Sequence, residues 1–171
     1  MLEGWGHWYQ GDFGAARECA EKSISLAREH RLTFGLPIAY LLLGIVCHAL
    51  GNLLEGRHSL EQAVNGAHQN NQKHFEGAAK VCLGRLIAEE ENSQAALAER
   101  TILDGLKMEE DLHIKPFQAW GHLYLGETYA MASQKDKAVA SLKKAREMCQ
   151  EMGIDYWLAR TENALEKLKG S

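Results

Sequence analysis

The sequence lacks the features that would place it among membrane, secreted or nucleic-acid-binding proteins. Its longest apolar stretch, Ile38 to Leu50, is interrupted by Gly44 and His48 and falls short of the ~18 residues that a membrane-spanning helix needs. Lysine and arginine (19) are fewer than aspartate and glutamate (23), and the two signs are interspersed, so no basic field favours nucleic acid. The first residues show no basic segment followed by an apolar core, so we expect no signal peptide. We therefore expect a cytoplasmic protein that binds neither membrane nor nucleic acid.

Cysteine is also scarce, and its spacing is uninformative about metals. The four cysteines, Cys19, Cys47, Cys82 and Cys149, include no close-spaced pair of the kind that binds zinc. We expect buried free thiols in a reducing compartment rather than disulfides or metal ligands. The eight histidines are dispersed as well. We therefore expect no metal and no cofactor.

Motifs that carry chemistry are missing too. Asp12-Phe13-Gly14 spells a kinase triplet, but neither a catalytic loop nor a glycine-rich loop accompanies it. We find no phosphate-binding loop with a lysine and no paired histidines of a helical zinc protease. The acidic run at residues 89–91 lacks the alternating oxygen ligands and the glycine bend of a calcium loop. We expect a protein that is not an enzyme and has no catalytic residues.

The sequence does contain a repeated helical pattern. Gly4, Gly44 and Gly84 recur at a constant interval, and the next interval, from Gly84 to Gly126, is two positions longer. A mid-helix glycine is less favourable than alanine by ~1 kcal/mol, so we expect each glycine to permit close contact with a second helix. Small or apolar residues recur on that second helix at nearly the same spacing, in two series: Ala16, Gly56, Ala98 and Ala138, and Ala20, Leu60, Ile102 and Leu142. The fixed interval predicts a stack of helical hairpins, with two extra residues in the turn of the third.

Turn and cap residues divide this pattern into four hairpins and a last helix. We predict one domain over residues 1–171, with a partial repeat at 1–31, repeats at 34–70, 73–111 and 115–152, and a capping helix at 154–169. Asp12 is a predicted helix N-cap, Asn92 or Ser93 another, and Pro37 fits the first turn of a helix. The predicted fold is all-α, a right-handed superhelical solenoid of antiparallel helix pairs with a C-terminal capping helix.

The residues around the turns resemble a known repeat. Leu-Gly in the first helix, the turns Gly11-Asp12-Phe13 and Gly51-Asn52-Leu53, and small residues on the second helix are similar to the tetratricopeptide repeat. The interval from Gly4 to Gly44 is longer than the standard one of about 34 residues, and the proline that usually closes each repeat is absent. Long repeats of this kind, and the closing segment at residues 134–161, resemble the C-terminal repeat regions of multidomain bacterial signalling proteins with a nucleotide cyclase and an ATPase domain. The resemblance implies a fragment of a larger protein that takes part in protein interactions.

In a solenoid of this type the first helix of each pair lines the concave wall. Residues six and three before the glycine, and one and four after it, share one face of that helix. The predicted binding residues on this face are Trp5, Trp8, Ile38, Leu41, Ile45, His48, Val81, Arg85, Trp120, Leu123 and Glu127. We expect the apolar members to anchor a protein or peptide segment, or other domains of the parent chain, and His48, Arg85 and Glu127 to orient it.

Other interpretations stay open at this point. The apolar residues could pack on the next hairpin and leave a shallow wall without a ligand, and Arg85 and Glu127 could form an ion pair between neighbouring helices. The protein could instead be a sensor that binds a small molecule or a signalling peptide and changes the curvature of the solenoid. Trp5, Trp8 and Tyr9 at an uncovered end further predict self-association through the N-terminal end.

Overall fold

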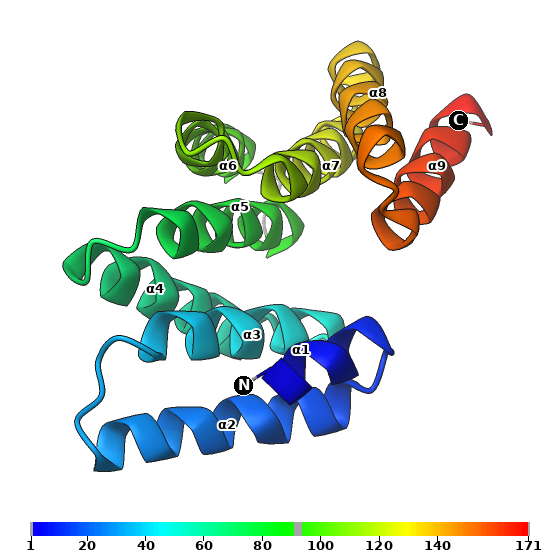
Figure 1. Ribbon diagram of the computed structural model, residues 1–171. Coiled ribbons are helices and arrows are strands. Elements are labelled where there is room, and N and C mark those ends of the chain that lie inside the picture. The colour runs from blue at the N-terminus through cyan, green and yellow to red at the C-terminus, as the bar shows by residue number, and fades with distance from the viewer. Residues whose placement is uncertain (1, 91–93, 171) are drawn as a thin grey trace. The chain divides into compact units, whose positions relative to one another are not determined.

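The computed structural model describes residues 2–90 and 94–170, which form nine helices and no strand (Figure 1). In chain order these are α1 (Leu2–Tyr9), α2 (Phe13–Glu29), α3 (Leu36–Ala49), α4 (Leu53–Gln69), α5 (Lys73–Glu90), α6 (Ala95–Asp111), α7 (Lys115–Met131), α8 (Lys135–Met152) and α9 (Asp155–Gly170). The all-α fold of consecutively packed helices is therefore confirmed. The N-cap predicted at Asn92 or Ser93 lies outside the described residues.

The chain divides into two compact units, Met1–Lys80 and Val81–Ser171, and the division falls within α5. In the first unit α1 packs on α2, α2 on α3, and α3 on α4. In the second, α6 packs on α7, α7 on α8, and α8 on α9. Alternate helices also touch, α1 with α3 and α7 with α9. Each unit is thus a short stack of antiparallel helix pairs, whereas the predicted division into repeats and the hand of the superhelix stay predictions.

The mid-helix glycines hold the two helices of a pair close together. A Cβ atom at Gly44 would lie 2.5 Å from Cγ of Leu60 on α4. At Gly84 it would lie 2.7 Å from the backbone oxygen of Ala98 on α6. Gly4 and Gly126 are enclosed in the same way. Because side chains do not fit at such distances, the close helix contact predicted from the recurring glycines is confirmed.

A residue with positive φ follows most of the helices and ends them. Gly51 has φ of 80°, and four residues other than glycine have φ between 54° and 58°: Arg31, Asn71, His113 and Ser133. The N–H of the next residue donates to a carbonyl five residues back, as from Asn52 to Cys47 at 2.8 Å. This Schellman arrangement satisfies the last carbonyls of the helix. It explains how the chain turns without the closing proline of the standard repeat.

Local sequence signals also position the helix starts. Asp12 accepts a hydrogen bond from the N–H of Ala15 at 3.1 Å, as an N-cap does, and Pro37 lies in the first turn of α3. Asp155 is the first residue of α9. On α9 one side is dry, with Trp157, Thr161 and Leu165 buried, and the other is exposed.

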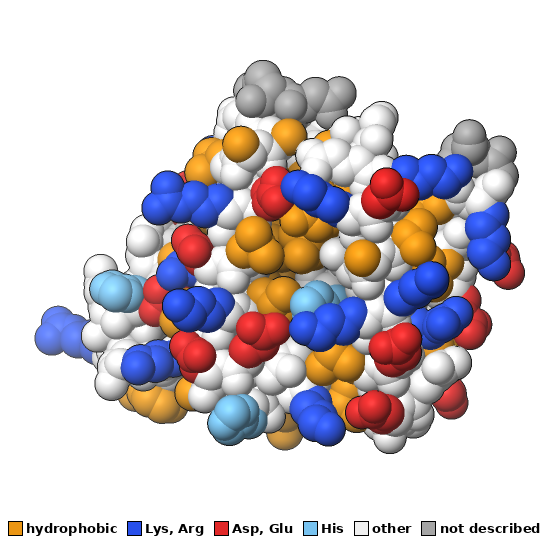
Figure 2. All heavy atoms as spheres, turned by 90° about the horizontal axis from the view of Figure 1, so that it is seen from above, with side chains coloured by type: hydrophobic (Ala, Val, Ile, Leu, Met, Phe, Trp, Pro, Cys, Tyr) orange, Lys and Arg blue, Asp and Glu red, His pale blue; other side chains and the backbone are white. Residues whose placement is uncertain are grey.

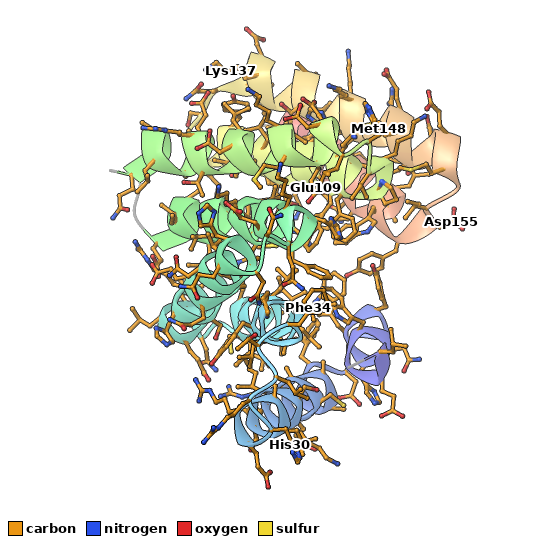
Figure 3. All side chains as sticks on the ribbon, turned by 60° about the vertical axis from the view of Figure 1, so that its left-hand side comes forward. His30, Phe34, Glu109, Lys137, Met148 and Asp155 are labelled. Atoms are coloured by element: carbon orange, nitrogen blue, oxygen red, sulfur yellow. The ribbon has the colours of Figure 1, made fainter. Side chains whose placement is uncertain are left out.

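Side chains from adjacent helices fill the space between them (Figure 3). Glu109 lies among the helices and is fully buried, whereas Lys137 points outward from α8. None of the helices in the described part of the chain combines the length and apolar character needed to cross a membrane.

Candidate functional site

The predicted binding residues occupy two kinds of position. Six of them are buried in the core: Trp8, Leu41, Ile45, Val81, Trp120 and Leu123. The others are half-buried: Trp5, Ile38, His48, Arg85 and Glu127. Whether this face binds a partner stays a prediction, and any contact would have to come from the half-buried members.

We expected Trp8 to be exposed at the N-terminal end, but its side chain is buried. Its ring packs edge-on against those of Trp5 and Tyr9, with centroids 5.9 Å and 4.8 Å apart. Because Trp8 is buried and Trp5 half-buried, the exposed aromatic surface at this end is smaller than the sequence suggested. Tyr9 and Leu2 remain exposed there.

Arg85 on α5 and Glu127 on α7 meet in the second unit, where a third residue joins them. Arg85 Nε donates to Oε2 of Glu127 at 2.9 Å. Arg160 on α9 donates through Nε and Nη2 to the two oxygens of the same carboxylate, each at 2.9 Å. The ion pair between neighbouring helices is therefore present, and one carboxylate ties three helices together. The Arg85 and Glu127 side chains are only 11% and 15% exposed, unlike those of an ordinary surface pair.

This arrangement fixes the charges of the cluster. Burial alone would raise the pKa of Glu127, but Arg160 and Arg85 outweigh burial and hold that pKa below its usual range. The Arg160 guanidinium lies 5.0 Å from the ring centroid of Tyr124 and 6.0 Å from that of Trp157. Burial raises the pKa of Tyr124 to about 12, so its hydroxyl stays protonated. At neutral pH Glu127 is thus an anion between two arginines, and Arg85 also pairs with Glu89.

A cleft of about 560 Å³ opens beside this cluster, mainly between α5, α7 and α9. Its polar lining comes from the cluster and from Asn163 and Lys167 on α9, and Met131 contributes an exposed apolar side chain. The remaining lining residues are Ala130, Leu142, Ala164 and Leu168. Fixed hydrogen-bond donors beside apolar contacts suit the binding of a peptide, and among the described residues of the cleft no nucleophile stands next to a general base.

Sequence reasoning missed the contribution of α9. The predicted concave face does not include this helix, which is predicted to cap the solenoid. When Trp120, Leu123 and Glu127 are advanced by the interval that separates Gly4 from Gly44, they lead to three residues that line the cleft: Arg160, Asn163 and Lys167. The repeat interval, which also separates α7 from α9, would therefore have predicted these three residues on α9.

A second cleft, of about 550 Å³, lies among α6, α7 and α8. His122 lines it and is 7% exposed, and burial lowers its pKa to about 4. Its Nε2 lies 3.8 Å from Oε1 of Glu110 and has no hydrogen-bond partner among the described residues. His122 is therefore a neutral imidazole at pH 7.

Neither the mixed surface charge nor the cysteines point to a nucleic-acid or metal site. On the face shown in Figure 2, hydrophobic side chains gather near the middle, and acidic and basic side chains are mixed around them. Cys47, Cys82 and Cys149 are buried and Cys19 is half-buried, all as free thiols, and burial raises the pKa of Cys47 to about 11. Within residues 2–90 and 94–170, no three metal-binding side chains lie together.

Comparison with known proteins identifies the repeat. Residues 4–30, which cover most of α1 and all of α2, match the tetratricopeptide repeat family. A search of curated proteins finds no match to this chain. The matched stretch pairs Gly4 with the region around Ala16 and Cys19, and the same pairing recurs at Gly44, Gly84 and Gly126. Tetratricopeptide repeats generally mediate interactions between proteins. The match thus supports a tetratricopeptide repeat at residues 4–30, and similar helix pairs follow it through the described residues.

Proposed function

We propose that this chain is a non-catalytic module that binds a protein or peptide segment, and that the cleft between α5, α7 and α9 is part of its binding surface. The observation that carries the proposal is the cluster in which Glu127 holds Arg85 and Arg160 at the edge of that cleft. Guanidinium groups are rigid hydrogen-bond donors, and here their side chains are already ordered. Binding of a segment to these arginines would therefore cost little additional side-chain entropy in the protein.

The chemistry of the cleft indicates what such a segment would present. Arg160, Asn163 and Lys167 supply donors, so backbone carbonyls or carboxylates are the natural partners. Met131 and Ala164 supply apolar contacts for one aliphatic or aromatic side chain. The segment expected to bind thus combines hydrogen-bond acceptors with one apolar anchor.

The wider role follows from the resemblance to bacterial signalling proteins. We propose that the chain is part of a larger cytoplasmic protein and regulates other domains of that protein by binding them or a separate partner. In the first unit, the half-buried Trp5, Ile38 and His48 would form a binding surface of its own. Exposed Leu2 and Tyr9 support self-association through the N-terminal end, and a monomer at all concentrations in sedimentation would contradict it.

The proposal can be tested with a partner captured from the source cell. Asn163→Ala and Lys167→Ala change two exposed side chains of the cleft without removing a core residue. We expect the pair to weaken binding by roughly tenfold, since hydrogen bonds to charged groups contribute about 1.5–3 kcal/mol each and less where solvent screens them. Asp104→Asn on α6, outside the cleft, is the matched control. Unchanged affinity in the double variant would exclude this cleft as the binding surface.

A sensor of small molecules is the second candidate. The clefts of about 560 and 550 Å³ fall within the range of about 300–1,000 Å³ typical of small-molecule sites. A ligand at a hundred times its Kd should stabilise the folded chain by about 2.7 kcal/mol. Thermal unfolding with a panel of metabolites would show this, and the absence of saturable stabilisation would leave protein binding as the only proposal.

A further inference from the structure

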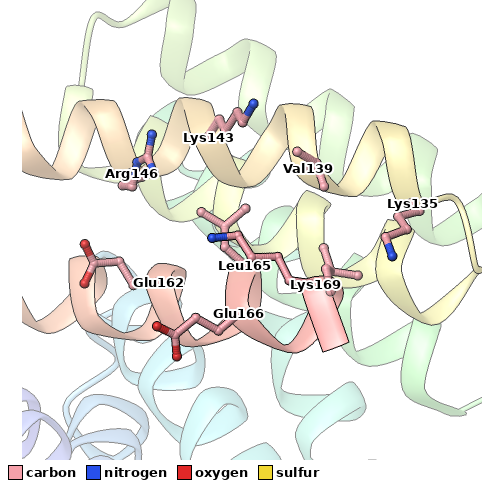
Figure 4. Close-up of a pocket in the computed structure, with 9 residues that line it drawn as sticks. Lys135, Val139, Lys143, Arg146, Glu162, Leu165, Glu166 and Lys169 are labelled. Atoms are coloured by element: carbon pink, nitrogen blue, oxygen red, sulfur yellow. The ribbon is translucent and has the colours of Figure 1, made fainter. Parts of the chain in front are cut away.

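A groove of about 710 Å³ runs between α8 and α9 (Figure 4). Its apolar floor consists of Val139, Leu165 and Leu168. Charged side chains border this floor on both helices: Lys135, Lys143 and Arg146 on α8, and Glu162, Glu166 and Lys169 on α9. On α9 these charged residues lie on a different face from Arg160 and Lys167, and the groove shares only Leu168 with the cleft proposed above.

The basic side chains on the α8 border of the groove have no acidic partner in the described part of the chain. Lys135, Val139, Lys143 and Arg146 are spaced by four, four and three residues, so they form one stripe along α8. No ion pair or hydrogen bond of the three basic side chains is found among the described residues. Nε of Arg146 is buried and lacks a hydrogen-bond partner within residues 2–90 and 94–170. A buried guanidinium N–H without an acceptor is unfavourable, and a carboxylate is the group that best satisfies it.

The equivalent positions one repeat earlier are built differently. Counted back by the interval that separates Gly4 from Gly44, the counterparts of Lys143 and Arg146 are Leu103 and Leu106 on α6. On α7 the counterpart of Glu166 is Gly126, where a Cβ atom would lie 2.6 Å from Cγ of Leu142 on α8. Apolar and small residues thus receive the next helix inside the second unit. At the α8/α9 groove charged residues replace them, and a helix cannot approach Glu166 as α8 approaches Gly126.

We infer that the α8/α9 groove binds an amphipathic helix of a partner protein that carries acidic residues along its edge over α8. Apolar side chains of that helix would cover Val139, Leu165 and Leu168, as in other complexes where a helix lies in an apolar groove. Carboxylates along its edge over α8 would meet Arg146 and the two lysines. Glu162 and Glu166 on the opposite border favour basic residues on the other edge, which fixes the direction of the bound helix.

Two labelled helical peptides provide the test. Both carry the same apolar stripe; one has glutamates along the edge over α8 and lysines along the other, and the second has these charges exchanged. Fluorescence anisotropy with the whole chain should show binding of the first peptide, weakened by salt, and binding of the second at least about tenfold weaker. Arg146→Met should weaken binding of the first peptide by about tenfold, because it removes the guanidinium and keeps an apolar stem. Lys144→Met, on α8 but lining the cleft of His122, is the matched control and should leave binding unchanged.

Several outcomes would overturn the inference. Equal affinity for the two peptides would show that the groove does not discriminate between them by charge. Equal losses of affinity for the first peptide in Arg146→Met and Lys144→Met would show the same. If Arg146→Met loses helicity, the double variant Lys135→Gln and Lys143→Gln changes only exposed side chains and must show the same weakening. A dimer of this chain that Arg146→Met abolishes, with neither peptide bound, would assign the groove to a second copy instead. Binding of anionic vesicles with neither peptide bound would assign it to lipid, and either result would contradict the inference.

Discussion

Replacing Glu127 with glutamine would remove the charge at which Arg85 and Arg160 meet, with almost no change in side-chain volume. The carboxylate accepts three N–H bonds, each at 2.9 Å. Glutamine offers only one oxygen, and its NH₂ group would face a guanidinium that is also a donor. At least one N–H would then lose its acceptor, and two positive charges would face each other without an anion between them.

Removing one partner of a buried ion pair lowers stability by about 3–5 kcal/mol. Two features reduce this figure here, because Arg160 is 34% exposed and Arg85 keeps an ion pair with Glu89. We therefore expect the free energy of unfolding to fall by about 2 kcal/mol, which lowers the Tm of a chain of this length by roughly 4–8 °C. Urea and thermal unfolding followed by circular dichroism would measure both quantities.

The pH dependence of this difference is a second, independent readout. The pKa of Glu127 is lower in the folded chain than in the unfolded chain, where it is about 4.3. Its contribution is complete above that unfolded pKa and is lost as pH falls through the lower folded value, so the difference between wild type and variant should shrink below about pH 4. Asp104→Asn is the control. Oδ2 of Asp104 lies 4.0 Å from Nε of Arg100, and the two side chains are 60% and 83% exposed, so this ion pair should contribute less than about 0.5 kcal/mol to stability. Equal losses in the two variants would refute the reasoning.

Three further predictions concern packing, turns and the buried histidine. Gly84→Ala should lower the free energy of unfolding by about 2 kcal/mol because its methyl group meets a backbone oxygen, whereas Gly6→Ala has open space; equal urea midpoints would contradict this. Ser133→Gly should raise stability by about 1 kcal/mol by relieving a positive φ, and Gly51→Ala should lower it comparably, as thermal unfolding would show. His122→Leu should flatten the loss of stability between about pH 6.5 and pH 4, where the unfolded chain takes up a proton and the folded chain does not; an unchanged slope would implicate other groups.

The helix pairing could be predicted because its cause is local. A glycine within a helix is unfavourable unless a neighbouring backbone needs the space, so the recurrence of Gly44 and Gly84 indicated contacts that the structure confirms. The conformations of the turns were less accessible. Arg31 and Ser133 adopt positive φ although neither residue favours it, because the Schellman closure requires that conformation.

The candidate site was only partly predictable. Spacing identifies the residues that share a helix face, but it does not show what covers that face, and Leu123 proved fully buried. Arg85 and Glu127 were predicted as polar points or as an ion pair, and the structure shows the pair. The contact of Arg160 with Glu127 could not be predicted from the sequence, because it depends on how α9 packs against α7.

The two opposite faces of α9 have a consequence for regulation. One face is anchored to Glu127 through Arg160, and the other forms a wall of the groove with α8. Any ligand that tilts or lifts this helix from one side alters the geometry presented on the other. If two ligands bind, their affinities are coupled by the same factor in both directions, whichever arrives first. The single helix α9 would then let the protein combine two incoming signals into one response.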